Sequence, residues 1–276
     1  MTPSAYVARV PSDAGETVVR SSTFEALSRA GFVARGLIYG IIGILAIKLA
    51  FGVGGEITDQ KGALRTVAQQ PFGEVLLVLV AIGLAGYSLW RLTRAAIGHG
   101  PESSDTGVER VGALGSGLVY AGLCAIAVEL LLNHPSGDST SPAKATGGVL
   151  GWPAGPWLVG TAGAVMIGVA AYQGHRGLTH DFLDDAKTEQ MGQATRRAFT
   201  WLGTFGHLAR MVVFGLIGIF LIKAAVDFAP KKAIGIDGAL AKLSNSSHGP
   251  ALLGVVAVGL IAFAVYSLAD ARFRRI

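Results

Sequence analysis

The chain has 276 residues, of which 51% are hydrophobic and 15% charged, and it contains 39 glycines. A soluble domain carries about 25% charged residues and about 7% glycine, so this composition excludes an ordinary soluble enzyme or binding domain. The net charge of +5 then indicates membrane topology and contact with lipids, not nucleic-acid binding.

Apolar stretches with few charges recur along the chain. They cover about residues 31–51, 74–92, 111–132, 155–173, 203–227 and 251–269. Each approaches the roughly 20 residues that a helix needs to cross about 30 Å of hydrocarbon. The sequence therefore predicts an all-α integral membrane protein with six transmembrane helices, whose first partner is the lipid bilayer.

An N-terminal arm at residues 1–23 precedes the first span and lacks the charged-then-apolar layout of a cleavable signal peptide. The first repeat then occupies residues 24–98 and contains two spans. Its first span carries Arg35 near one end and Lys48 near the other. Long cationic side chains near a helix end can extend to the headgroups, so Arg35 is expected to be an interfacial anchor.

The second repeat, residues 109–182, is a weaker copy of the first. Its first span has Gly117-Leu-Val-Tyr120 where the first repeat has Gly36-Leu-Ile-Tyr39, and its second span has Gly168 to Tyr172 where the first has Gly83 to Tyr87. Ser116, however, stands in the place of Arg35, and Glu129 stands in the place of Lys48. The second repeat is therefore expected to differ from the others in its charges.

A cytoplasmic connector at residues 183–198 leads to the third repeat, residues 199–276, which matches the first repeat without a gap in its first span. The matched pairs are Gly31/Gly206, Ala34/Ala209, Arg35/Arg210, Gly40/Gly215, Gly43/Gly218 and Lys48/Lys223. Gly83 and Tyr87 of the second span match Gly259 and Phe263. Arg210 is therefore expected to be a second interfacial anchor.

The number of spans in each repeat determines how the repeats are related. Because each has two spans, successive copies enter the membrane in the same orientation and are related by an axis along the membrane normal. The expected architecture has pseudo-threefold symmetry about that axis. Arginine and lysine gather in the N-terminal arm, after the second and fourth spans, and in the C-terminal tail. The positive-inside rule then places both termini in the cytoplasm.

Four motifs of the first repeat are distinctive. They are Ala-Arg-Gly-Leu-Ile-Tyr-Gly at residues 34–40, the loop from Asp59 to Leu64, Pro71-Phe72-Gly73, and the spacing of Gly83 and Tyr87. Together they resemble an actinobacterial membrane family whose members carry three copies of a two-helix domain of unknown function. The resemblance covers about residues 24–276. It implies six spans in a bacterial plasma membrane and implies no activity.

Lys48, Glu129 and Lys223 occupy the same position in the three repeats, so a pseudo-threefold bundle would place them at one depth. Charges inside a membrane are costly and point to a function. We hypothesise that Glu129 pairs with Lys48, Lys223 or both. Such a charged layer would hold the repeats together or line an ion path.

Histidines are the candidates for a redox cofactor, because transmembrane histidines can ligate haem. His175 and His207 would be the ligands. The stretch from His175 to His180 contains a glycine, and its spacing does not align ligands on one helix face. A solvated cluster is favoured, so no metal site and no cofactor is expected.

The sequence contains no phosphate-cradling glycine loop and no nucleophile elbow, and its longest loops are too short to fold a catalytic domain. An enzyme is therefore not expected. The favoured function is a structural or accessory membrane protein that binds lipids or another membrane complex. Two alternatives stay open: a small-ion or solute transporter or channel that uses the charged layer, and a haem or quinone redox subunit. The oligomeric state is not predicted.

Overall fold

The computed structural model describes residues 22–53, 57–97, 107–132 and 142–275. Its long helices are α2 (Ser22–Ala50), α4 (Gly73–Ile97), α5 (Gly107–Leu131), α7 (Gly155–Thr179), α8 (Gln193–Val226) and α10 (Gly249–Phe273). The short helices α3 (Gln60–Ala68), α6 (Pro142–Leu150) and α9 (Ile236–Ser244) lie between them. All six long helices are long and apolar enough to cross a membrane, and the described residues form no strand. The predicted all-α membrane fold is confirmed.

Each repeat consists of a long helix, a short helix and a second long helix. α3 begins after Asp59, whose side chain caps the helix by accepting a hydrogen bond from the backbone N–H of Gly62 at 2.8 Å. The short helices of the first and third repeats each bury an Ala-Leu pair, at residues 63–64 and 239–240. The α6 helix of the second repeat buries only Thr146 among its described residues. The second repeat therefore lacks the apolar wedge of the other two.

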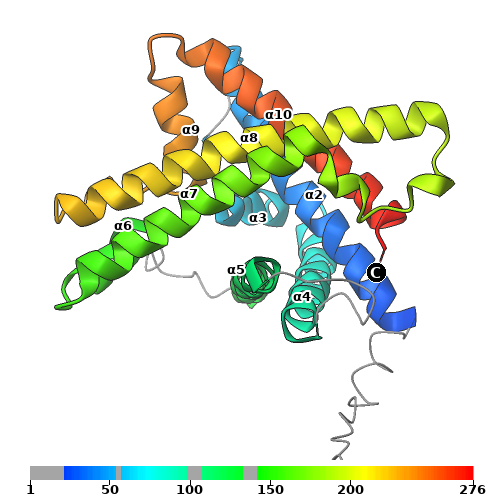
Figure 1. Cartoon of the computed structure of the whole chain (residues 1–276), viewed down its shortest axis with the longest axis horizontal. Coiled ribbons are helices and arrows are strands. Elements are labelled where there is room, and N and C mark those ends of the chain that lie inside the picture. Colours follow the sequence, from blue (N-terminus) through cyan, green and yellow to red (C-terminus); the bar gives the residue numbers. More distant parts are fainter. Residues whose placement is uncertain (1–21, 54–56, 98–106, 133–141, 276) are drawn as a thin grey trace, which may run out of the picture.

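The long helices pack in a cyclic order that follows from the repeat. The first helix of each repeat lies against the second helix of the preceding repeat, so that α5 packs on α4, α8 on α7, and α2 on α10. Within the first and third repeats the two long helices also pack together, α2 on α4 and α8 on α10. Within the second repeat, the described parts of α5 and α7 form no extensive interface. The pseudo-threefold ring is therefore open between α5 and α7 (Figure 1).

The three boundaries between repeats share one register. The residues in contact are Gly36 with Leu268, Gly117 with Leu92, and Met211 with Gly174, and further along Gly43 with Ala257, Cys124 with Ala81, and Gly218 with Gly163. This register makes Val165 of α7 the equivalent of Gly83. The sequence match of Gly168 with Gly83 is therefore three residues out of register.

The second repeat also lacks the close contacts that join the long helices of the other two. Gly31 and Gly206 lie where a Cβ atom would collide with Tyr87 and Phe263 of the second helix. Gly112, the equivalent residue in α5, has no atom within 4 Å of the place where its Cβ would be. In Figure 1, α4 and α5 are seen nearly end-on while α7 and α8 run lengthwise across the view. The two pairs of helices thus cross steeply.

Adding one methyl group should distinguish the packed interface between α2 and α4 from the open seam between α5 and α7. Gly31→Ala is expected to destabilise the protein by about 1–3 kcal/mol, because the added Cβ collides with Tyr87. Gly112→Ala should not destabilise the protein, and can stabilise it by up to about 1 kcal/mol, because alanine is the better helix former. Thermal unfolding of the purified protein in detergent measures both effects. Equal destabilisation by the two changes would contradict the difference between the seams.

The open seam should close in a bilayer. Spanning helices are tilted by at most about 40°, so the two pairs of helices must come closer to parallel than Figure 1 shows, which moves α7 toward α5. Ala34 and Gly83 touch in the first repeat, and their equivalents are Gly115 and Val165. Gly115→Cys with Val165→Cys, in a Cys124→Ser background, is expected to form an intramolecular disulfide when isolated native membranes are treated with copper phenanthroline, which catalyses oxidation of the two thiols by dissolved oxygen. Non-reducing electrophoresis would show a shifted monomer, whereas a dimer band or no cross-link would contradict closure.

Candidate functional site

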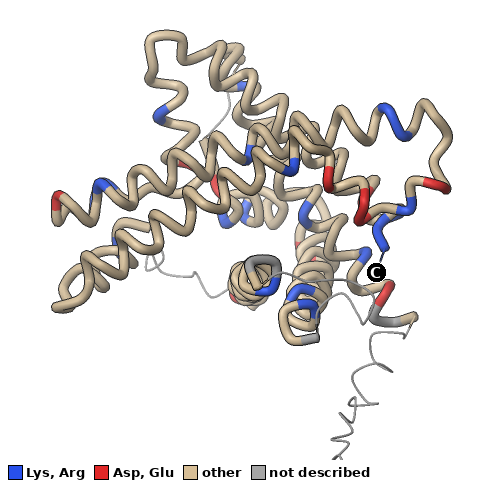
Figure 2. Tube along the Cα trace, in the orientation of Figure 1, with Lys and Arg blue, Asp and Glu red and all other residues tan. Residues whose placement is uncertain are grey.

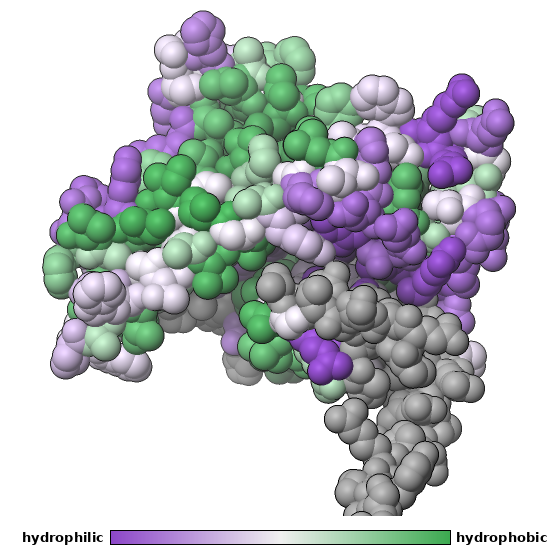
Figure 3. Space-filling view, viewed as in Figure 1, coloured by the Kyte–Doolittle hydropathy of each residue, from purple (hydrophilic) through white to green (hydrophobic). Residues whose placement is uncertain are grey.

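Buried and half-buried arginines gather at the end of the bundle where the C-terminus and the α7–α8 connector lie. We name Arg35 of α2, Arg91 of α4, Arg176 of α7, Arg210 of α8 and Arg274 after α10 the arginine cluster. Charged residues are concentrated along the trace at this end (Figure 2). The surface is hydrophilic there and apolar over the middle of α7 and α8 (Figure 3). The cluster therefore lies where the apolar spans meet a polar surface.

Arg35 is turned into the protein, and only 7% of its surface is exposed. Its guanidinium donates hydrogen bonds to the hydroxyls of Tyr87 at 2.8 Å and Ser267 at 3.1 Å, and to the carboxylate of Asp270 at 3.3 Å. Its Cζ atom also lies 5.0 Å from the ring centroid of Phe263. Arg35 thereby joins α2 to α4 and α10. The anchor role expected from the sequence remains a prediction.

Asp270 begins a chain of ion pairs that leaves the spans. Its carboxylate, which is 1% exposed, also lies 3.5 Å from the guanidinium of Arg274. Arg274 in turn pairs with Asp185 of the connector at 2.9 Å, and Asp185 pairs with Arg176 of α7 at 2.6 Å. Buried charges are tolerated only when they are paired and hydrogen-bonded. The chain of ion pairs therefore ties α10, the connector and α7 together.

The members of this chain outside the spans are held in their charged forms. Burial alone would raise the pKa of the Asp185 carboxyl, but Arg274 and Arg176 together outweigh it and hold that pKa well below its usual range. Burial alone would lower the pKa of Arg274, but Asp185 and Asp270 outweigh it and raise that pKa. Both groups are therefore charged at neutral pH.

Backbone hydrogen bonds strengthen the junction between the connector and the C-terminal end of α10. The N–H of Lys187 donates to the carbonyl of Phe273 at 2.7 Å, and the N–H of Arg275 donates to the carbonyl of Asp185 at 2.9 Å. Ala186 and Arg274 form an antiparallel bridge between them. The last residues of the described chain are thus fastened to the segment that joins the second and third repeats.

Arg210 occupies the position of Arg35 in the third repeat and has a different acceptor. With its side-chain oxygen toward Arg210, Gln173 of α7 accepts hydrogen bonds from both terminal nitrogens, at 2.9 and 3.0 Å. The NH₂ group of Gln173 then donates to Nδ1 of His207 at 2.8 Å. The Arg210 guanidinium lies 4.4 Å from the ring centroid of Phe263, the ring that Arg35 also contacts. Both guanidiniums therefore have a protein acceptor and share an aromatic partner.

Trp90 of α4 is surrounded by guanidiniums. The Cζ atoms of Arg94, Arg274 and Arg91 lie 5.0, 5.5 and 5.6 Å from its ring centroid. Arg274 is neutralised by its two carboxylates. The buried Nε atom of Arg91 has no hydrogen-bond acceptor among the described residues. A buried donor without an acceptor is costly, so the Nε of Arg91 is left without the acceptor that it needs.

The charged layer predicted from the sequence is not assembled by any contact of the described residues. Lys48, Glu129 and Lys223 are all exposed, and no ion pair of the described chain joins them. The Nζ atom of Lys223 instead lies 5.3 Å from the ring centroid of Phe220. The layer stays a prediction, and its assembly would require the ring to close.

The two histidines considered for haem lie in different surroundings. His175 is exposed, and its Nδ1 atom lies 3.2 Å from the carboxylate of Asp181. His207 is buried and stacks on Phe182 with ring centroids 5.4 Å apart. The structure does not bring the two imidazoles together. No group of three or more potential metal ligands occurs in the described residues.

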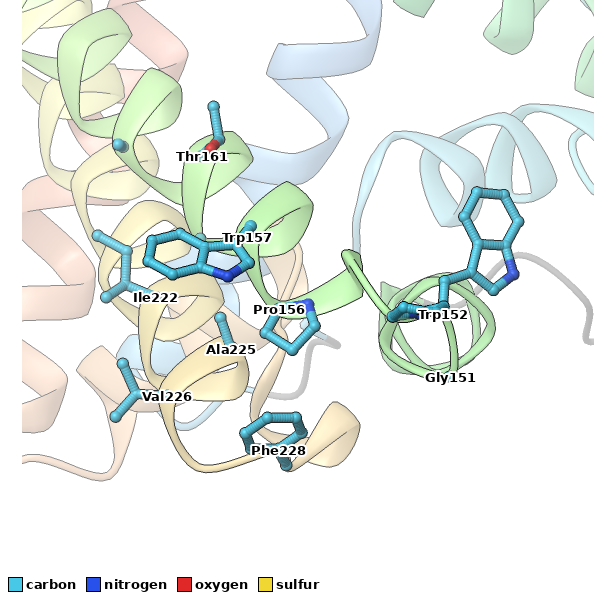
Figure 4. A pocket seen from close by; sticks show the side chains of 12 residues that line it. Gly151, Trp152, Pro156, Trp157, Thr161, Ile222, Ala225, Val226 and Phe228 are labelled. Carbon is cyan, nitrogen blue, oxygen red and sulfur yellow. The ribbon is translucent and has the colours of Figure 1, made fainter.

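An apolar cavity of about 820 Å³ opens at the far ends of α7 and α8. Its lining includes Trp152, Pro156, Trp157, Ile222, Val226 and Phe228. Figure 4 shows Trp157 lying beside Ile222, with Pro156 at the start of α7 and Phe228 after the end of α8. Thr161 adds a hydroxyl to a lining that is otherwise mainly hydrocarbon. This lining offers little to select a polar ligand.

The sequence did not single out Asp270, Asp185, Tyr87 or Gln173 as site residues. An acid within the most apolar helix was the available signal for Asp270. Asp185 lies in a connector that contains several acids, and nothing in the sequence distinguishes it from its neighbours.

Removing the Asp270 carboxylate should strongly destabilise the protein. Asp270→Asn leaves Arg35 without its carboxylate and Arg274 with only one, and breaking a buried pair costs about 3–5 kcal/mol. Glu189→Gln is the control, because the ion pair of Glu189 with Arg275 is exposed. Thermal unfolding in detergent should show a large loss for Asp270→Asn and none for the control. Equal stability of the two variants would show that Asp270 does not hold the cluster.

Comparison with known proteins identifies the repeated unit. The model of the family described as Domain of Unknown Function (DUF1206) matches residues 30–103, 111–180 and 205–274. An uncharacterized protein of Bacillus subtilis (strain 168), YxxB, is 34% identical over 244 residues, which cover 87% of each chain. No solved structure matches the chain. The protein is thus similar to a bacterial protein without an assigned activity, and it belongs to the DUF1206 family, of which it carries three tandem copies.

Proposed function

We propose that this protein is an accessory membrane protein that binds anionic phospholipids of the cytoplasmic leaflet through its arginine cluster. The charge balance of the cluster carries the proposal. In the described part of the chain, three of its five guanidiniums, those of Arg35, Arg176 and Arg274, share two carboxylates, Asp185 and Asp270, and the other two have no carboxylate. Such an excess of positive charge at the end of a span attracts anions, and phospholipid headgroups are the anions of a membrane surface.

The predicted topology supports this assignment. The arginine cluster lies at the end of the bundle with the α7–α8 connector and the C-terminal tail, which the positive-inside rule assigns to the cytoplasm. Exposed arginines add to the charge of this end: Arg196, Arg197, Arg272 and Arg275. Each basic residue near an anionic leaflet contributes about 1 kcal/mol of attraction. The transporter and redox alternatives have no comparable support, since no contact within the described ranges joins the charged layer or the two histidines.

A lipid titration tests the proposal. Purified protein in neutral detergent is heated with phosphatidylglycerol or with phosphatidylcholine, and the unfolding temperature is recorded. Phosphatidylglycerol is expected to stabilise the protein more, by about 2.7 kcal/mol at a hundredfold excess over the dissociation constant, and high salt should weaken the difference.

The matched control for this titration is Lys231→Gln, because Lys231 is exposed at the opposite end of the bundle. This variant should keep the preference for phosphatidylglycerol. Equal stabilisation of the wild-type protein by both lipids would contradict the proposed function.

A further inference from the structure

The three boundaries between repeats carry equivalent polar positions. The packing contacts that give these boundaries one register also align the side chains beside them. The position in the first helix is occupied by Arg35, Ser116 and Arg210, and the facing position in the second helix by Ser267, Arg91 and Gln173. One turn further along the second helix the equivalent residues are Asp270, Arg94 and Arg176.

At two of these boundaries the arginine of the first helix has an acceptor on the second helix. At the α2–α10 boundary, Arg35 of the first helix donates to Ser267 and Asp270 of the second. At the α8–α7 boundary, Arg210 of the first helix donates to the side-chain oxygen of Gln173 of the second. In both, the guanidinium and its acceptor come from the protein.

At the third boundary, between α4 and α5, the arginine lies on the second helix instead of the first, and it lacks an acceptor among the described residues. Its arginine is Arg91 on the second helix, and the first helix offers the small hydroxyl of Ser116. The hydroxyl of Ser88, one turn before Arg91, is already used, because it donates to the backbone carbonyl of Gly117 at 2.8 Å. Among the described residues nothing accepts a hydrogen bond from the buried Nε of Arg91. A guanidinium is present here without the acceptor that the other two boundaries have.

We propose that a phosphate group binds at the α4–α5 boundary and takes the place of the missing acceptor. The planar guanidinium of Arg91 matches two phosphate oxygens, and the Ser116 hydroxyl can donate to a third. Arg94, whose guanidinium lies over the same face of α4 at Trp90, adds positive charge. This inference rests on the proposed function and gives it one defined site, with the phosphate supplied by a lipid headgroup or by free phosphate.

Size and charge favour phosphate over a protein carboxylate as the occupant. Ser116 is smaller than the arginine that α2 and α8 carry at the same position, Arg35 and Arg210. The guanidinium of Arg91 suits a phosphate better than a neutral acceptor, because charge-assisted hydrogen bonds are the stronger ones. The half-buried Arg91 side chain remains within reach of the membrane interface. A phosphate here would restore the charge balance that Asp270 supplies at the α2–α10 boundary.

Three probes and two variants test the site on the full-length protein in neutral detergent. The probes are phosphatidylglycerol, a galactolipid without phosphate, and inorganic phosphate, each titrated while the unfolding temperature is recorded. The variant is Arg91→Gln, and the control is Arg196→Gln, which removes an exposed arginine from the same end of the bundle. Phosphatidylglycerol should bind Arg91→Gln about ten- to hundredfold more weakly than the wild-type protein, as expected for the loss of charge-assisted hydrogen bonds. The control should bind at most about fivefold more weakly than the wild type, because one exposed basic residue near an anionic leaflet contributes about 1 kcal/mol.

The outcomes separate the site from the proposed function. A phosphatidylglycerol response that Arg91→Gln loses supports both. A response to inorganic phosphate that Arg91→Gln loses, without any preference for phosphatidylglycerol over the galactolipid, supports the site with free phosphate as its ligand and overturns the proposed function. A phosphatidylglycerol affinity that Arg91→Gln lowers no more than Arg196→Gln does overturns the site and leaves the proposed function standing. No response to either phosphate probe overturns both.

A second variant keeps the test decisive if Arg91→Gln does not fold. Ser116→Asp places a carboxylate at the α4–α5 boundary, opposite Arg91, and so supplies the acceptor from the protein. It is expected to raise the unfolding temperature without lipid and to abolish the response to phosphate probes. An unchanged response to those probes in a folded Ser116→Asp protein would overturn the site.

Discussion

A guanidinium inside a membrane helix must have acceptors within reach, and this requirement organises one whole end of the molecule. Arg35 satisfies it by pairing with Asp270, which also pairs with Arg274. Arg274 pairs in addition with Asp185. Each acid therefore holds two elements together. The packing of α2 on α10 and the attachment of the connector to the C-terminal end both depend on this alternation of charge.

The repeats have kept their packing register while their polar residues have diverged. Glycine and small-residue contacts align all three boundaries, because backbones in a membrane approach closely only where side chains are small. The polar positions are not restricted in this way. At the α4–α5 boundary the arginine, Arg91, lies on the second helix instead of the first. The same middle repeat has a short helix without an Ala-Leu wedge and a seam that is open. The open seam between α5 and α7 and the missing acceptor at the α4–α5 boundary thus both involve the second repeat.

Much of the fold could be predicted from the sequence, because apolar length and repeated glycines are local signals. Six spans, three repeats and the divergence at Ser116 and Glu129 all came from such signals. The site could not be predicted in the same way. The anchor role of Arg35 stays a prediction, whereas its contact with Asp270 could not be predicted, because the two residues are remote in the chain and no local pattern indicates that contact. The open seam was also beyond prediction, since it depends on how the described parts of α5 and α7 pack, which no local pattern indicates.

The ion pair of Arg35 with Asp270 joins residues that are 235 positions apart, and this separation matters while the chain is being made. A ribosome adds about 5–20 residues per second, so α2 is synthesised roughly 12–47 s before the acid that neutralises it. During that interval the Tyr87 hydroxyl of α4 is available to Arg35, but the carboxylate that neutralises Arg35 is not. The last helix therefore completes the insertion of the first, and a chain truncated before α10 would leave α2 poorly retained in the membrane.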